Sequence, residues 1–320
     1  MMTIVCASQE TRKFLWALFL FCATSLWAIP KPPLNENQTF APIYAFEFLT
    51  FKSANPEKTY LEVFCQIPTD HLQFIKCKDG FFASFRLTIS LSEGTGRNVV
   101  EESYVDSVKV KTFWDIDRVR DPKLIRYAFL VPPGIFEAKM SLKDLETFRQ
   151  MTFSKTLEIP DYSIKNLTMS DLQIAASITK TQEQNGLVKN HRKILPNIPR
   201  IVGSELDMLY VYNEVYNLDI SDETESKGFT ASYTVIDEKG QRVKTLEVTH
   251  QKPNISSFLT ASISVEELTS GQYKLILDVW DLDNNSVIRK STNFLVLRPG
   301  LDAKLYTDIL AKAFGERVRF

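Results

Sequence analysis

The chain has 320 residues, of which 44% are hydrophobic and 12% aromatic, a composition that predicts a packed globular protein and excludes a disordered or fibrous one. Its 38 basic and 39 acidic residues leave a formal net charge of -1. Without long blocks of like charge the chain has no field that would gather nucleic acid, so we expect no nucleic-acid partner. The length suits two domains of ordinary size.

The N-terminal residues have the pattern of a secretory signal. Arg12 and Lys13 precede an apolar run that starts at Phe14 and is followed by "IPKPP". The run of about 15 residues is shorter than the roughly 20 that a bilayer-spanning helix needs. We predict a signal peptide over residues 1–28, cleaved after Ala28, and an exported mature chain without a transmembrane segment. An uncleaved membrane anchor is the alternative.

Export would place the two cysteines of the mature chain in an oxidising compartment, where a disulfide can persist. If residues 59–68 and 72–78 form a hairpin centred near His71, Cys65 and Cys77 lie opposite each other. This predicts a hairpin and a candidate disulfide between Cys65 and Cys77. The alternative is two separate thiols that behave as small hydrophobes.

From Thr59 the sequence is a series of short segments rich in aromatic and β-branched residues, which predicts β-strands. In residues 85–91 the apolar side chains alternate with polar ones, as in an antiparallel sheet that packs on one face. We place a first β-sandwich domain at residues 29–185. Residues 167–178 fit either a helix or a last strand. Residues 186–200 are polar and hold two prolines, which predicts a linker or a long exposed hairpin.

A second series of about seven short strands over residues 201–298 predicts an immunoglobulin-like or fibronectin-type sandwich. The two halves share several features in the same order. Each has a Y-x-x-V strand, then "GFFASF" at residues 80–85 or "GFTASY" at residues 228–233, and later a glycine turn followed by an aromatic strand. We therefore predict an all-β chain in which one sandwich unit occurs twice.

Residues 299–320 have apolar side chains near helical spacing, which predicts a short amphipathic helix. We expect this helix to dock onto the second sandwich. Docking onto a partner chain is the alternative.

The sequence shows no catalytic constellation. The three histidines, His71, His191 and His250, are isolated, and we expect them on the surface or in turns. No phosphate-binding loop, GxSxG elbow or HExxH helix occurs, so we predict no catalytic residues and no cofactor. The acid-rich turn "WDLDNNS" makes Asp281, Asp283 and Asn285 a candidate calcium site, with a plain turn between two strands as the alternative.

Four strings together resemble the N-terminal part of bacterial GWxTD-domain proteins: "LEVFCQIPTDHLQFIKCKDGFFASFRLTISL", "LVPPGIFEAKMSLKDLET", "IPDYSIKNLTMSDLQIAASI" and "ILPNIPRIVGSELDMLYVYNEVYNL". The resemblance implies an exported bacterial protein with tandem β-sandwich modules. The Gly-Trp-x-Thr-Asp string itself is absent, so we expect either a truncated relative or a stand-alone version of the modules.

These features predict a non-enzymatic binding or scaffold protein of the bacterial periplasm or cell envelope, with a protein or glycan partner. The alternative is a carboxylate-based hydrolase or a carbohydrate-active accessory protein of the envelope. A cleft lined by aromatic side chains and paired acids would favour the alternative, and smooth sandwiches with exposed edges would favour binding.

Overall fold

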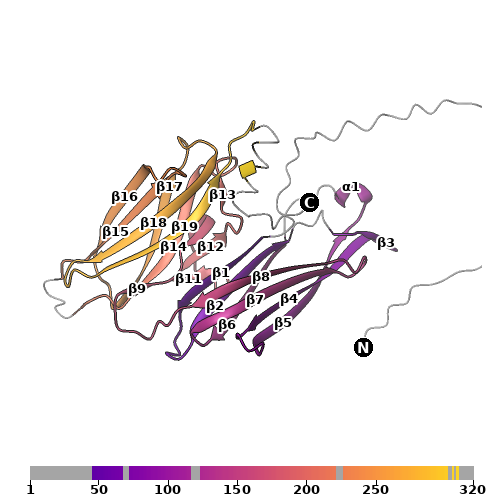
Figure 1. The fold of residues 1–320 in the computed structure, drawn as a ribbon. Coiled ribbons are helices and arrows are strands. Elements are labelled where there is room, and N and C mark those ends of the chain that lie inside the picture. The colour runs from indigo at the N-terminus through magenta and orange to yellow at the C-terminus, as the bar shows by residue number, and fades with distance from the viewer. Residues whose placement is uncertain are drawn as a thin grey trace, which may run out of the picture. The chain divides into compact units, whose positions relative to one another are not determined.

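The computed structural model describes residues 45–67, 72–116, 123–220 and 226–301, together with Leu305, Asp308 and Ile309. These residues belong to one compact unit and form an all-β fold (Figure 1). The one helix among the described elements is a single turn, α1 (Phe113–Ile116). The predicted signal peptide, residues 1–28, lies outside the described residues.

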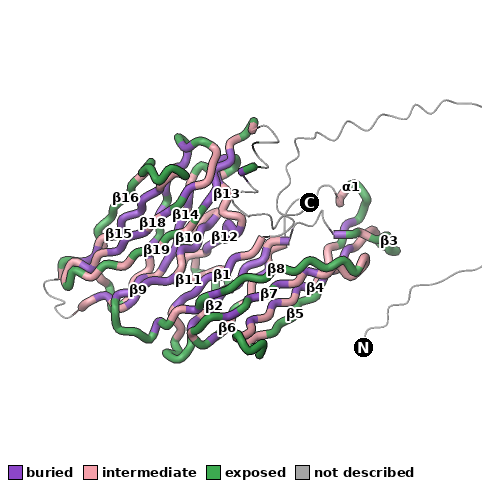
Figure 2. The backbone as a smooth tube through the Cα atoms, in the orientation of Figure 1, coloured by how far each residue is buried: buried purple, intermediate pink, exposed green. Residues whose placement is uncertain are grey.

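Four sheets can be followed in the described chain. Sheet A has the order β1 (Ala45–Lys52), β2 (Thr59–Ile67), β6 (Lys123–Val131). Sheet B has the order β5 (Asn98–Val110), β4 (Gly80–Ser92), β7 (Gly134–Asp144), β8 (Gln150–Ile159), and β3 (Ile75–Cys77) pairs with the start of β4. Buried and exposed residues alternate along β7, as expected for a sheet that covers a core on one face (Figure 2).

The remaining strands form sheets C and D. Sheet C has the order β11 (Val188–Lys189), β12 (Arg192–Pro196), β10 (Gln173–Lys180), β14 (Met208–Tyr216), β17 (Ser256–Ser264), with β9 (Thr168–Met169) also on β14. Sheet D has the order β13 (Ile201–Val202), β19 (Val287–Val296), β18 (Gly271–Asp281), β15 (Phe229–Ile236), β16 (Arg242–His250).

The two halves of the chain repeat one strand order. In sheets A and B the pairings are β1-β2-β6 and β5-β4-β7-β8, and in sheets C and D they are β10-β14-β17 and β16-β15-β18-β19. Along the chain, the strands alternate between the two sheets of each half in the same sequence. The described residues therefore form β-sandwich structure of the immunoglobulin or fibronectin-like kind, with a three-strand path and a four-strand path in each half of the chain.

Three hydrophobic clusters connect the sheets. One lies between sheets A and B, a second lies between sheets C and D, and a third joins the other face of sheet A to sheet C. Strand β2 is buried on both faces, because Leu61, Val63 and Cys65 pack toward sheet B while Phe64 packs toward sheet C.

The two similar hexamers lie in matching strands, β4 and β15, but in different register. Phe85 is opposite Asp144 in the β4–β7 pair, whereas Phe229 is opposite Asp281 in the β15–β18 pair. Phe85, the last residue of the first hexamer, thus occupies the position that Phe229, the second residue of the second hexamer, occupies in the other half. Relative to the end of its partner strand, β4 therefore extends further than β15 does. Residues 80–82 belong to this extension and pair with β3.

The structure corrects one sequence expectation and decides between the alternatives of two others. The hairpin centred near His71 is wrong, because β2 pairs with β1 and β6 while β3 pairs with β4 in another sheet. For residues 186–200 the structure has the hairpin and not the linker, since β11 and β12 pair with each other and β12 joins sheet C. Residues 167–178 form β9 and β10, so the ambiguous segment is extended and joins the second half of the repeat.

The predicted helix at residues 299–320 falls mostly outside the described residues, and no helical element is defined in its described part. Ile309 is nevertheless buried against Leu295 and Leu297 of the second half.

Gly228 provides a test of the turn that starts the repeat motif. Its φ is +83°, and an added Cβ would lie far inside van der Waals contact with the carbonyl oxygen of His250. We expect Gly228→Ala to lower the free energy of unfolding by about 2 kcal/mol or more. Gly94→Ala, where the added carbon meets nothing within 4 Å, should change it by less than about 0.5 kcal/mol. Equal effects in urea unfolding would contradict the strain at Gly228.

Candidate functional site

The Y-x-x-V motifs, residues 60–63 and 212–215, lie on β2 and β14 and share a glutamate before the valine: Glu62 and Glu214. Strand alternation puts these glutamates on the faces that sheets A and C turn toward each other, beside the side chains of Phe64 and Tyr212. The shared glutamate was the sequence signal for this site. The Y-x-x-V pattern alone indicates a structural repeat and does not distinguish a buried, paired glutamate from an exposed one.

Glu62 is completely buried and holds two cations. The Arg126 guanidinium donates to Glu62 Oε1 from Nε at 3.2 Å and from Nη2 at 2.6 Å, and the Lys189 ammonium pairs with Glu62 Oε2. Arg126 Nη2 also donates to the Tyr60 hydroxyl at 2.6 Å. A buried carboxylate needs such partners, because an unpaired charge would be strongly destabilised by desolvation.

Lys189 reaches Glu62 because a tight turn places it there. Asn190 and His191 both have positive φ, the backbone geometry of a two-residue hairpin turn, and they connect β11 to β12. The Lys189 Nζ lies 3.8 Å from the Phe51 ring centroid and donates to Gln173 Oε1 at 2.9 Å. Burial lowers the pKa of Lys189, and the ion pair with Glu62 opposes that shift.

Glu214 is held by neutral donors. It accepts hydrogen bonds from the Tyr212 hydroxyl at 2.6 Å, the Tyr216 hydroxyl at 2.8 Å and Asn190 Nδ2 at 3.3 Å. Burial, followed by the negative charge of Glu214, raises the pKa of both tyrosines, so their hydroxyls stay protonated and remain donors.

A cavity of about 460 Å³ opens beside these side chains. The residues that line it come from sheets A and C and from the segment before β11: Phe51, Lys52, Tyr60, Glu62, Arg126, Asn185, Gly186, Val188, Lys189 and Glu214. Aromatic rings, amide groups and paired charges thus converge on one hollow, the mixture that fixes small polar ligands in orientation. We call it the A–C cavity.

A second buried acid links the two halves of the repeat. Glu47 Oε1 accepts from Arg200 Nε at 2.9 Å and from Arg200 Nη2 at 2.7 Å, and Arg200 Nη1 donates to Thr292 Oγ1. Burial raises the pKa of Glu47, and Arg200 opposes that shift. Arg200 belongs to the segment expected near a domain boundary, which explains why sequence reasoning did not find the pair.

The candidate calcium residues surround an internal cation. Lys252, whose side chain is buried, pairs with Asp281 Oδ1 and, at 2.6 Å, with Asp283 Oδ2. Asn285 sits in the turn with φ +57°. Among the described residues no group of three or more His, Cys, Asp or Glu side chains could hold a metal ion. The structure thus gives both aspartates a lysine partner, and calcium binding stays a prediction.

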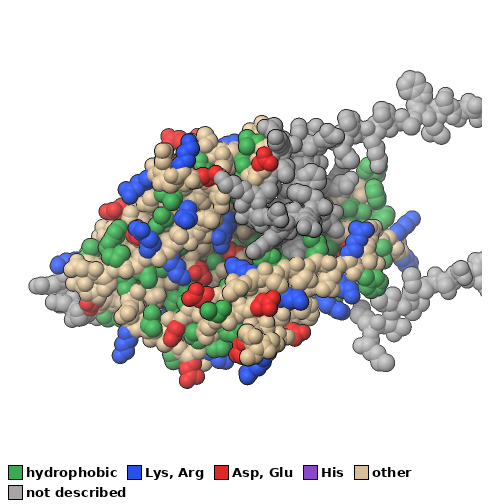
Figure 3. Space-filling model, viewed as in Figure 1, with side chains coloured by type: hydrophobic (Ala, Val, Ile, Leu, Met, Phe, Trp, Pro, Cys, Tyr) green, Lys and Arg blue, Asp and Glu red, His purple; other side chains and the backbone are tan. Residues whose placement is uncertain are grey.

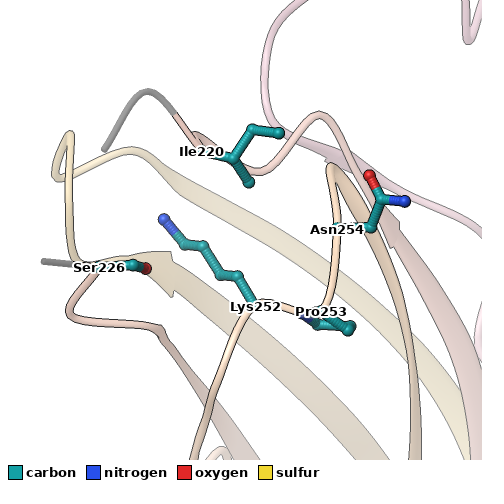
Figure 4. A pocket seen from close by; sticks show the side chains of 5 residues that line it. All are labelled: Ile220, Ser226, Lys252, Pro253 and Asn254. Atoms are coloured by element: carbon teal, nitrogen blue, oxygen red, sulfur yellow. The ribbon is translucent and has the colours of Figure 1, made fainter. Parts of the chain in front are cut away.

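Lys252 also borders a hollow of about 360 Å³ (Figure 4). Its side chain extends between Ile220 and Ser226, with Pro253 and Asn254 on the same loop. Hydrogen bonds to the two aspartates raise the pKa of Lys252 against the opposing effect of burial, so this ammonium stays charged. The described residues that line this hollow include no aromatic ring, whereas Phe51 and Tyr60 line the A–C cavity.

The structure places the described histidines apart from each other and the two cysteines in different sheets. His191 is exposed in the β11–β12 turn, His250 stacks on Phe229 at a centroid distance of 5.2 Å, and His71 lies outside the described residues. Cys65 and Cys77 are free thiols in different sheets, the first buried and the second exposed, so the candidate disulfide is not present. Burial raises the pKa of the Cys65 thiol to about 12, which makes it unreactive.

No protein-family model matches the chain, and no curated protein matches it. Among solved structures, a β-glucuronidase from Parabacteroides merdae aligns with 10% identity over 73% of this chain and 28% of its own, with a TM-score of 0.25. Fibronectin(III)-like modules of Clostridium thermocellum CbhA align with 10% identity over 77% of this chain and 89% of theirs, with a TM-score of 0.20. The chain thus spans less than a third of the glucuronidase.

Breaking the buried ion pairs should cost more than breaking an exposed one. We expect Glu62→Gln to lower the free energy of unfolding by about 3 kcal/mol, because it leaves Lys189 and Arg126 without their counter-charge. Lys189→Met should lower the free energy of unfolding by less in the Glu62→Gln variant than in the wild type, since the two residues interact directly. Lys193→Met on the same hairpin, where the ion-paired side chains are 43% and 56% exposed, should cost less than about 1 kcal/mol. If urea unfolding shows that the effects of Glu62→Gln and Lys189→Met simply add, the two residues are not coupled.

The Lys252 pair should be visible in an acid titration. Hydrogen bonds, first of all from Lys252, lower the pKa of Asp283 to about 2. A depressed carboxyl pKa adds stability above the unfolded-state value near 3.8, and this contribution is lost as pH falls toward 2. We expect Lys252→Met to raise the pKa of Asp283 toward 3.8 in carboxyl NMR while leaving that of Asp161, lowered by Ser163, unchanged. An unshifted Asp283 would refute the pairing.

Proposed function

We propose that this chain is an exported, non-enzymatic binding protein of the bacterial cell envelope, with the A–C cavity as its ligand site. The observation that carries the proposal is that each carboxylate in the cavity is already committed to hydrogen bonds or ion pairs. Glu62 is held by Arg126 and Lys189, and Glu214 is held by two tyrosine hydroxyls and an amide. Such groups are pre-organised for recognition.

General acid–base catalysis needs a group that changes its protonation state during the reaction. Glu62 is ion-paired with two cations, Arg126 and Lys189. No histidine or cysteine is among the described residues that line the cavity. The chemistry of the lining therefore favours binding over proton transfer.

The lining favours a small polar ligand, and we propose a saccharide unit. A cavity of about 460 Å³ is within the usual range of roughly 300–1,000 Å³ for small-molecule sites. Tyr60 and Phe51 supply rings, while Asn185, Arg126 and Glu214 supply planar donors and acceptors that match hydroxyl groups. A glycan partner fits these concave surroundings better than a protein partner, which would need a broad surface.

Export and envelope location rest on the signal-like pattern of residues 1–28 and on the resemblance to bacterial GWxTD-domain proteins. The proposal includes two tandem sandwich domains, which is supported by the repeated strand order. No helix among the described residues is long and apolar enough to cross a bilayer. The burial of Ile309 against Leu295 supports docking of the C-terminal segment onto the second sandwich.

A carbohydrate-active hydrolase is the second candidate, because the cavity brings together two glutamates and aromatic rings, Glu62 and Glu214 beside Phe51 and Tyr60. The two candidates differ in turnover. If the chain is a hydrolase, incubation with oligosaccharides releases reducing ends and Glu214→Gln abolishes the release. If it is a binding protein, the oligosaccharide is recovered intact.

Gly186 offers a way to fill the cavity. An added Cβ there would lie 2.8 Å from Arg126 Nη1, so the guanidinium would have to shift, and the backbone φ lies outside the strained positive range. We expect Gly186→Leu to weaken binding of bacterial envelope oligosaccharides about tenfold or more in calorimetry, because the leucine fills the site. Gly94→Leu, at an open surface turn, is the matched control.

The same circular dichroism spectrum for both variants would establish that they are folded. Unchanged affinity in Gly186→Leu would remove the A–C cavity from the proposal. A complete lack of binding across peptidoglycan fragments and envelope oligosaccharides would remove the glycan partner.

A further inference from the structure

The far end of sheet B in the first half of the repeat carries apolar side chains that the second half lacks. Residues 80–84 extend β4 past the β7–β8 turn. Strand β3 pairs with this extension, and α1 follows the end of β5. Figure 1 shows β3, α1 and the ends of β4 and β7 at one end of the sheet. The extension therefore adds a small structure that the fold does not need.

Large hydrophobic side chains at this end face solvent. Trp114 is 73% exposed and Phe113 60%, although Phe113 also contacts Phe81 edge-on at a centroid distance of 6.0 Å. Ile75 of β3 is exposed as well. Exposure of contiguous aromatic residues is costly in water and marks a contact surface.

Phe148 adds a second, independent observation at the β7–β8 turn. It is 70% exposed and has φ +60°, a left-handed conformation that is unfavourable for phenylalanine. The matching turn of the second half has Asn285 at φ +57°, a residue that tolerates this geometry. A strained and exposed phenylalanine at a turn where asparagine would suffice indicates a role outside folding.

Basic residues are interspersed among these side chains. Lys76 and Lys78 flank Cys77, Lys111 precedes α1, and the Lys143 ammonium lies 5.4 Å from the Phe148 ring centroid. Figure 3 shows hydrophobic and basic side chains together at this end of the molecule. Acidic residues also lie at this end: Asp79 follows Lys78, Asp115 accepts from the Thr112 amide and Glu146 accepts from the Ser84 hydroxyl.

We propose that this aromatic-basic tip, formed by Ile75, Phe113, Trp114 and Phe148 with Lys76, Lys78, Lys111 and Lys143, docks onto an anionic lipid surface. Aromatic side chains settle at the headgroup level of a bilayer, and lysines nearby are attracted to anionic headgroups. Separate turns that converge to a point suit shallow insertion, whereas a protein partner would need a broad face.

The backbone of the tip is prepared for a less polar environment. Asp144 accepts the amide hydrogens of Gln73, Glu146 and Thr147, and Asp115 accepts that of Thr112. Backbone donors that are satisfied within the protein lower the cost of leaving water. The tip would attach the protein to the membrane peripherally while the A–C cavity stays in solution.

The test uses the exposed thiol of Cys77, which lies within the tip, while Cys65 is buried. In the full-length chain carrying Cys6→Ser and Cys22→Ser, a fluorophore on Cys77 is exposed to vesicles that contain a lipid-borne quencher. We expect quenching on vesicles of phosphatidylglycerol and phosphatidylcholine, and much less on phosphatidylcholine alone.

Phe113→Ser with Trp114→Ser should raise the lipid concentration needed for half-maximal quenching about tenfold or more, since losing about 1.4 kcal/mol of apolar burial is a tenfold change in affinity. Lys76→Glu with Lys111→Glu should remove the preference for anionic vesicles. The matched control is Leu130→Ser with Ile135→Ser, two exposed hydrophobic residues near the opposite end of β7. This control should keep full quenching.

Three results would overturn the proposal: no quenching on anionic vesicles, equal quenching in the Phe113 and Trp114 variant, or equal loss in the control. Sedimentation of the labelled chain without lipid tests whether the tip instead forms a dimer. If the tip instead joins two copies of the chain, the wild type sediments as a dimer and the Phe113 and Trp114 variant as a monomer, which would replace the lipid surface with a protein partner.

Discussion

The burial of sheet A on both of its faces is the constraint on which the rest of the structure depends. Strand β2 sends Leu61, Val63 and Cys65 into one core and Phe64 into another, so its register is fixed from two sides. A shift by one residue would exchange these faces and bring Glu62 into the apolar core. The buried charge of Glu62 is tolerable only because the neighbouring sheet delivers Lys189 to it. Packing and electrostatics therefore select the same register.

Local patterns predicted the individual strands well. The alternation from Phe85 to Leu91 identifies β4, and turn residues mark the ends of β7 and β18. The repeat was also visible, because the same hexamer begins matching strands. The sequence does not show that the hexamers differ by four residues in their pairing with β7 and β18, because register depends on which neighbour a strand meets. A single sequence holds no record of that neighbour.

The failures have a common physical origin in contacts between distant segments. The hairpin expected around Cys65 and Cys77 is the shortest closure available, but the chain crosses from sheet A to sheet B between them. The polar segment before Arg200 looked solvent-exposed because its lysine and arginine side chains are charged, yet Lys189 and Arg200 are the counter-charges of buried acids. Residue type alone does not distinguish a solvated lysine from a buried partner.

The equivalence of β2 and β14 has a consequence for symmetry. The two halves meet through the outer faces of sheets A and C, and an isologous two-fold dimer of identical subunits would also meet through the same face of each subunit. In such a dimer the two glutamates would need identical surroundings. Here the halves share one chain, so Glu62 receives two cations while Glu214 receives hydroxyl and amide donors. Covalent linkage keeps the halves at high effective concentration, and it allows the two faces to differ from each other.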